Sequence, residues 1–263
     1  MHQLFLFFIC ICATTLGAIS GIGGGVIIKP VLDATSGMGV SAISFLSGCT
    51  VLTMTVVSLL RSRGGEVKIE AKRGTLLAIG GAAGGIAGKW LFDFLKAAFG
   101  NDAVVGTAQS VMMVILTLGV LAYVLNKQRI RSLQVRSGVA CVAIGLGLGI
   151  LSAFLGIGGG PINLAVLYYF FSMDSKTAAL NSLYVILFSQ SASFLSTVLQ
   201  GKVPEFSVPA LVVMMIGGVA GGFLGRSVSK RMDNRKVDVL FRWMLVLITA
   251  ISVYNLIRYA SAI

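Results

Sequence analysis

The sequence GIGGG occupies residues 21–25 and occurs again at residues 156–160, each time inside a long apolar stretch. Glycine loses more backbone freedom on ordering than any other residue, so such a run interrupts a helix and leaves amide N–H groups without partners. In hydrocarbon an unpaired amide is costly, and irregular backbone at membrane depth therefore lines a cavity or is buried in protein. Two breaks at matching positions of two halves are typical of a transporter binding site.

The composition is that of a membrane protein. Charged residues make up 11% of the chain and hydrophobic residues 56%, whereas roughly 25% of a soluble domain is charged. The net charge of +12 comes mainly from three short basic segments, at residues 61–73, 127–136 and 226–242. The positive-inside rule places such segments in the cytoplasm. This distribution argues against nucleic acid as a partner and indicates a lipid bilayer instead.

The repeat extends beyond the two breaks. A glycine-rich tract at residues 80–88 is followed by Lys89, and a matching tract at residues 217–225 is followed by Arg226. Each half therefore has the same order of elements: a glycine break, a Ser/Thr-rich helix, a glycine-rich helix and a final helix. We expect a first transmembrane repeat in residues 1–125, a basic cytoplasmic linker in residues 126–136 and a second repeat in residues 137–263.

The predicted fold class is an all-α membrane protein with four elements in each half. The broken stretches, residues 4–32 and 137–173, are too long for one span of about 20 residues and short for two. We expect each to form a helical hairpin that turns back at its glycines. All three basic segments are then cytoplasmic, and the two repeats are inverted. The unbroken helices are expected at residues 40–60, 74–95 and 103–125, and at residues 177–199, 208–228 and 239–259.

Helices that begin just after the breaks are candidates for an anion site. Their first N–H groups and the positive ends of their dipoles would converge near the membrane midplane. Proline suits the first turn of a helix, as at Pro161. The alternative is that the glycines only allow close packing and that the polar side chains bond between helices. The candidate binding residues are Gly23, Gly24, Gly25, Gly158, Gly159, Gly160, Asn163, Ser47, Thr50, Asn181, Ser182 and Gln190.

Few charged residues fall within the spans. Lys29 and Asp33 are spaced i, i+4, which predicts a local ion pair. Lys89 and Arg226 lie near span ends, where their charges can reach the interface. The glycine-rich tracts are interpreted as packing seams. The spans hold no histidine, no paired carboxylates and no nucleophile elbow, so we expect no enzyme, cofactor or metal site.

The paired GIGGG motifs, the second of which continues as Pro161-Ile162-Asn163, and the eight-element layout resemble the TauE/SafE family of sulfite exporters. The resemblance covers essentially the whole chain. It implies an inner-membrane transporter of small sulfur-containing anions such as sulfite, thiosulfate or organosulfonates. The first motif departs from the second because it continues as Val26-Ile27-Ile28-Lys29-Pro30, so the halves are expected to contribute unequally.

The predicted function is therefore secondary transport by alternating access, with the anion bound by backbone amides at the two breaks. A passive anion channel, and a membrane scaffold or subunit of a larger complex, are the alternatives. The sequence leaves open the coupling ion, proton or sodium, and whether the protein is a homodimer.

Overall fold

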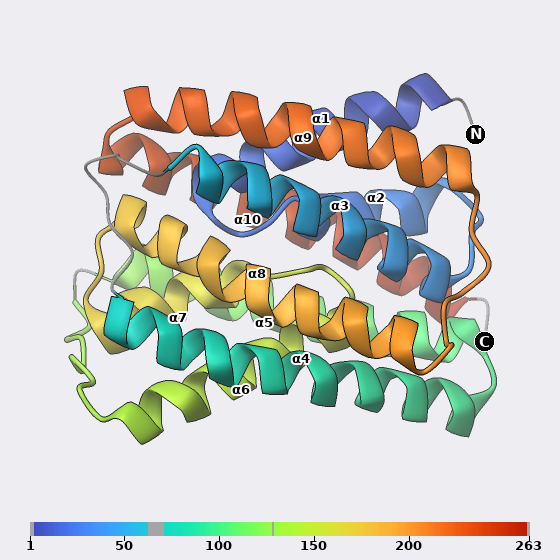
Figure 1. Cartoon of the computed structure of the whole chain (residues 1–263), viewed down its shortest axis with the longest axis horizontal. Coiled ribbons are helices and arrows are strands. Elements are labelled where there is room, and N and C mark those ends of the chain that lie inside the picture. Colours follow the sequence, from blue (N-terminus) through green and yellow to red (C-terminus); the bar gives the residue numbers. More distant parts are fainter. Residues whose placement is uncertain (1–2, 63–70, 128, 262–263) are drawn as a thin grey trace.

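The computed structural model describes residues 3–62, 71–127 and 129–261, which contain ten α-helices and no strand (Figure 1). The prediction of an all-helical chain is confirmed. Eight helices are long and apolar enough to cross a membrane. The other two, α2 and α7, have 11 residues each, or about 16 Å of helix. The helices are α1 (Gln3–Ser20), α2 (Gly25–Thr35), α3 (Val40–Leu60), α4 (Ala71–Phe99), α5 (Asp102–Asn126), α6 (Gly138–Leu155), α7 (Pro161–Phe171), α8 (Ser175–Leu199), α9 (Val208–Arg231) and α10 (Asn234–Ala260).

The six unbroken helices lie where the apolar runs predict them. Helix α3 has the predicted bounds, and the other five are longer by a few residues at one or both ends. Capping side chains set several of these starts, because they accept from N–H groups that have no partner within the helix. Asn101 accepts from Ala103 before α5, and Asp233 accepts from Lys236 before α10.

Each broken stretch contains two helices separated at the glycines. Helix α1 ends at Ser20 and α2 begins at Gly25, whereas α6 ends at Leu155 and α7 begins at Pro161. Several residues between them have positive φ, which glycine adopts without strain; they are Gly21, Gly23, Gly156, Gly158 and Gly159. The start of α2 packs back on α1, since a Cβ built at Gly24 would lie 2.7 Å from the Thr14 methyl carbon.

The two glycine-rich helices hold the molecule together by close backbone contact. A Cβ at Gly80, Gly84 or Gly88 of α4 would lie 2.1–2.3 Å from a carbonyl oxygen of α6. The corresponding face of α9 packs on α1, and in both helices a second row of glycines packs on the polar helix of the other half. Side chains larger than hydrogen would separate these backbones. The interpretation of these tracts as packing seams is confirmed.

The connections gather at the two ends of the helix bundle according to charge. In Figure 1 the ends of α3, α5 and α9, which carry the basic segments, lie at one end of the bundle. The start of α1, the end of α10 and the connections after α2, α4 and α8 lie at the other end. Residues 63–70, the middle of the first basic segment, lie outside the described residues.

Candidate functional site

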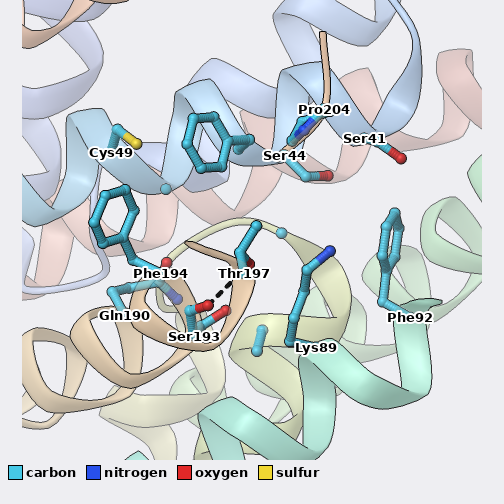
Figure 2. Close-up of a pocket in the computed structure, with 14 residues that line it drawn as sticks. Ser41, Ser44, Cys49, Lys89, Phe92, Gln190, Ser193, Phe194, Thr197 and Pro204 are labelled. Atoms are coloured by element: carbon cyan, nitrogen blue, oxygen red, sulfur yellow. Dashed lines mark hydrogen bonds between the residues drawn. The ribbon is translucent and has the colours of Figure 1, made fainter. Parts of the chain in front are cut away.

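A cavity opens between α3, α4 and α8 and reaches the second glycine break (Figure 2). It encloses about 510 Å³ between the lining atoms, its open mouth included. Because Pro204 follows α8, the mouth lies at the end of the bundle that also holds both chain ends. The lining residues are Ser41, Ser44, Phe45, Gly48 and Cys49 of α3, Lys89 and Phe92 of α4, Gln190, Ser193, Phe194 and Thr197 of α8, and Ala153, Gly156 and Pro204.

Lys89 supplies the positive charge of this cavity. Figure 2 shows its ammonium group pointing from α4 into the space between α3 and α8. The Nζ atom donates to Asp93 Oδ1 at 2.6 Å and lies 4.9 Å from the centre of the Phe92 ring. An ammonium group has three donors, so this ion pair leaves others for a ligand. Besides lying near the end of its span, as interpreted from the sequence, Lys89 lines this cavity, and its side chain is 15% exposed.

Neutral polar groups surround the ammonium group. Ser44 Oγ is buried and has no hydrogen-bond partner among the residues that the structure describes. Gln190 Nε2 donates to Ser152 Oγ at 3.3 Å behind the cavity wall. At the mouth, Lys96 Nζ donates to Ser41 Oγ at 2.7 Å. The lining thus combines the ammonium group of Lys89 with hydroxyl and amide groups, and a second ammonium group, that of Lys96, lies at the mouth. This set suits a small hydrated anion.

The two glycine breaks lie directly against each other at the inner end of this region. A Cβ at Gly25 would lie 2.0 Å from the Ile157 carbonyl oxygen, and one at Gly159 would lie 3.1 Å from the Ile22 carbonyl oxygen. The N–H groups of residues 22–24 and 157–160 donate to no backbone carbonyl in the described part of the chain. The breaks therefore bring a set of amide donors together at a contact that leaves no room for a side chain at Gly25 or Gly159.

Several predicted site residues meet at this contact between the breaks. Gly23 lies next to Gly158, since a Cβ on Gly23 would lie 3.4 Å from the Gly158 carbonyl oxygen. Ser182 Oγ donates to the Gly21 carbonyl at 2.5 Å. Ser47 Oγ lies 2.8 Å from a Cβ built at Gly25, and it has no hydrogen-bond partner among the described residues. Gln190 lies farther out, on the cavity wall.

Three other predicted residues lie elsewhere. Thr50 donates to the Leu46 carbonyl and Asn181 to the Thr177 carbonyl, each within its own helix. Asn163 is 2% exposed and lines a separate small cavity together with Gly159 and Gly160. Its Oδ1 accepts no hydrogen bond from the described residues.

Two features were not predicted from the sequence: the place of Lys89 in the cavity, and the burial of Arg226, which occupies the matching position in the second half. Arg226 is 6% exposed, and its Nε has no partner among the described residues. The signal was present, because both cations follow matching glycine tracts. No group of three His, Cys, Asp or Glu side chains that could hold a metal occurs in residues 3–62, 71–127 or 129–261.

The sequence profile described as "Sulfite exporter TauE/SafE" matches residues 6–253. The chain belongs to the TauE/SafE family. Among curated proteins, this TauE/SafE protein is 24% identical to "Probable membrane transporter protein YunE" of Bacillus subtilis (strain 168), over 97% of this chain and 98% of the relative. No protein of known structure matches it. Because it belongs to this family and has eight helices that are long and apolar enough to cross a membrane, the TauE/SafE protein is a multi-pass membrane transporter.

Proposed function

We propose that this TauE/SafE protein is a secondary transporter of small sulfur-containing anions in the cell inner membrane. The observation that carries the proposal is the cavity in which Lys89, Ser44 and Gly156 line the same space. Charge-assisted hydrogen bonds to an ionised ligand are worth roughly 1.5–3 kcal/mol each. A few such bonds from Lys89 and from the hydroxyl and amide side chains of the lining offset much of the dehydration of a sulfur oxyanion.

We infer that the basic end of the bundle is cytoplasmic, because short basic connections are retained on that side. The cavity then opens to the outside. Its lining reaches no deeper than the breaks, at Cys49, Gly156 and Gln190. The conformation described here is accordingly outward-open.

We further infer that residues 1–125 and 137–263 form inverted repeats joined by the linker at 126–136. Helix α1 packs along α9, and α6 packs along α4; α3 also packs on α9, and α8 on α4. Exchanging α1 with α6, α3 with α8 and α4 with α9 converts each contact into another of the set. Gly21 packs on Ala179, and Gly156 packs on Ser44. These two contacts correspond, because residues 21 and 156 are 135 positions apart and so are residues 44 and 179.

This correspondence identifies a closed counterpart of the cavity on the cytoplasmic side. Applying the offsets of the two repeats to the cavity lining leads to five buried polar residues, Thr55, Ser58, Ser62, Arg226 and Ser229, and to the half-buried Lys176 and Tyr184. On the closed side Ser182 donates to the Gly21 carbonyl. On the open side Ser47, which corresponds to Ser182, makes no equivalent hydrogen bond within the described residues. Exchange of these two arrangements would close the outer cavity and open the inner one.

The closed inner side favours a carrier over a passive channel, which requires a continuous path. Proteoliposome uptake of radiolabelled sulfite, thiosulfate and sulfoacetate tests the proposal. We expect saturable uptake of at least one anion, stimulated by the same unlabelled anion inside the vesicles. Uptake without such stimulation indicates a channel, and no uptake of any of the three anions contradicts the proposed function.

A further inference from the structure

A second cavity lies beside the second glycine break, between α2, α5 and α10. It shares no lining residue with the anion cavity. The lining residues are Lys29, Pro30 and Asp33 of α2, Gln109, Ser110 and Met113 of α5, Ser252 and Asn255 of α10, and Leu155 and Ile157 at the end of α6.

Hydrogen bonds fix the orientation of the two amide side chains in this second cavity. Gln109 Nε2 donates to the Phe154 carbonyl at 2.6 Å, and Asn255 Nδ2 donates to the Pro30 carbonyl at 2.8 Å. Because a carbonyl can only accept, these bonds identify the nitrogen of each amide. The remaining oxygens, Gln109 Oε1 and Asn255 Oδ1, are buried and accept no hydrogen bond from any described residue.

Two further oxygens in the same cavity are also unpaired. Ser252 Oγ and Asp33 Oδ1 are buried and have no hydrogen-bond partner within the described residues. Leaving a buried acceptor unsatisfied costs roughly 1–3 kcal/mol. Three of these oxygens are neutral acceptors without a donor, and the fourth belongs to Asp33, whose carboxylate also faces the Tyr259 hydroxyl. Such a set favours a ligand that offers positive charge or donors.

The lining of the cavity holds one charge of each sign, on Lys29 and Asp33. Lys29 Nζ donates to Asp33 Oδ2 at 2.9 Å, and their side chains are 4% and 8% exposed. This confirms the ion pair that the i, i+4 spacing predicts. Arg258 donates to the Asp33 carbonyl, and the Tyr259 hydroxyl lies next to the Asp33 side chain. A single carboxylate that is already paired with a lysine leaves too little negative charge to bind a divalent cation.

We propose that this second cavity binds a sodium-sized monovalent cation through Asp33 Oδ1, Gln109 Oε1, Ser252 Oγ and Asn255 Oδ1. Hard cations prefer carboxylate, amide and hydroxyl oxygens as ligands. Water completes the coordination shell of the ion. The cation is the coupling ion of the transporter, a role that rests on the proposed function, whereas binding itself does not.

The last turn of α6 links the two cavities. Ala153 and Gly156 line the anion cavity, while Leu155 and Ile157 line the cation cavity. Gln109 holds the Phe154 carbonyl of the same turn, so a cation on its Oε1 acts directly on the wall of the anion cavity. An anion in the first cavity and a cation in the second would lie on opposite sides of this turn and attract each other. Each ligand therefore raises the affinity for the other by the same factor.

The binding step is tested with purified protein in detergent and no sulfur anion present. The measurement is the apparent melting temperature in sodium chloride against choline chloride at equal ionic strength. We expect sodium to raise it by about 3 °C or more in the wild type and to have no effect in Ser252→Ala. The matched control is Thr249→Val, one turn earlier on α10, where the hydroxyl bonds to the Leu245 carbonyl and to Thr117 Oγ1, both outside the cavity. This control should keep the sodium effect.

Because the readout is a difference between two salts, a general loss of stability in a variant does not mimic the result. The site is disproved if sodium and choline give the same melting temperature in the wild type, or if Ser252→Ala responds as the wild type does. Proteoliposome flux separates this inference from the proposed function. Sodium stabilisation without sulfur-anion flux keeps the cation site and contradicts the function. Flux driven by a pH gradient and insensitive to sodium keeps the function and contradicts the coupling cation.

Discussion

The two GIGGG segments have the same sequence and different surroundings. Gly21 of the first segment lies against the backbone of Ala179, where a Cβ would come within 2.3 Å of the Ala179 Cα, and its carbonyl accepts from Ser182. Gly156 of the second segment lines the outer cavity, beside Ser44. Both segments therefore pack closely on a polar helix, the first on α8 and the second on α3, but only the second also borders the outer cavity.

In the proposed alternating-access cycle, we infer that the motif acts as a movable contact rather than a fixed pocket. Ser47 and Ser182 occupy corresponding positions in α3 and α8, yet only Ser182 makes its hydrogen bond to a break. One hydroxyl group per half, bonded on the closed side and unbonded on the open side, is what a two-state gate requires.

The largest effect is expected from filling the contact between the breaks. Gly25→Val places atoms on the Ile157 carbonyl oxygen, and Gly159→Val adds a branched side chain at φ +141°, with a Cβ only 2.4 Å from Ile186 Cδ1. We expect each substitution to lower flux by about 100-fold or more, because neither break can then approach the other. Flux in proteoliposomes, normalised to inserted protein, measures this loss.

Gly147→Ala is the matched control for these variants. Gly147 belongs to α6, and a Cβ there would meet no atom within 4 Å. This variant should transport at the wild-type rate. Ordinary flux in Gly25→Val or Gly159→Val would mean that the contact between the breaks is not part of the transport cycle.

A smaller effect is expected from removing the cation on the open side. Lys89→Gln should weaken anion binding about ten-fold, since it removes a charge-assisted hydrogen bond. It also leaves Asp93 with only its longer ion pair to Lys202, at 3.8 Å, so the double variant with Asp93→Asn separates the two causes. Calorimetry in detergent measures both variants. Full recovery of affinity in the double variant would show that Lys89 only neutralises Asp93 and does not hold the anion.

The helices, the glycine seams and the Lys29–Asp33 pair could be predicted from the sequence because each depends on local spacing. Apolar run length fixes a span, and glycines at i, i+4 and i+8 fix a close contact. The hydrogen bond between Lys29 and Asp33 needs only one helical turn. None of these features requires knowledge of which helices become neighbours.

The site depended on information that local spacing does not contain. Thr50 and Asn181 bond to carbonyls of their own helices, a common alternative to a ligand for such residues. The place of Lys89 follows from the packing of α4 between α6 and α8. Gln109 and Asn255 come from α5 and α10, far apart in the sequence, and meet only in the folded chain. The predicted repeat boundaries and binding residues stay predictions.

The hydrogen bond on the closed side gives a third, smaller effect. Ser182→Ala removes the bond to the Gly21 carbonyl, which is worth about 1 kcal/mol, and should shift the population toward the inward-open state about five-fold. Ser47→Ala removes no hydrogen bond in the outward-open state and is the matched comparison. The labelling rate of Ser58→Cys from the cytoplasmic side, in a background without native cysteines, measures the shift. Equal labelling in the two serine variants would contradict the gate.

The smallest effect concerns the starts of the two polar helices. Asp174 caps α8 by accepting from the N–H groups of Lys176 and Thr177, whereas Gly39 gives α3 no side-chain cap. Burial alone would raise the pKa of Asp174, but hydrogen bonds from Thr177 and Lys176 outweigh it and lower the pKa. A carboxylate with a lowered pKa stabilises the folded state at neutral pH, and this contribution is lost as the pH falls through the folded-state pKa.

Because Asp174 is largely exposed, Asp174→Ala should lower the apparent melting temperature by only about 2–4 °C at neutral pH, with a smaller difference from the wild type in acid. Thermal scans at several pH values measure the gap, and Gly39→Ser on α3 should shift the midpoint the opposite way. A gap that stays constant into acid would show that the charge of Asp174 does not stabilise α8, and the two helix starts would then differ in sequence alone.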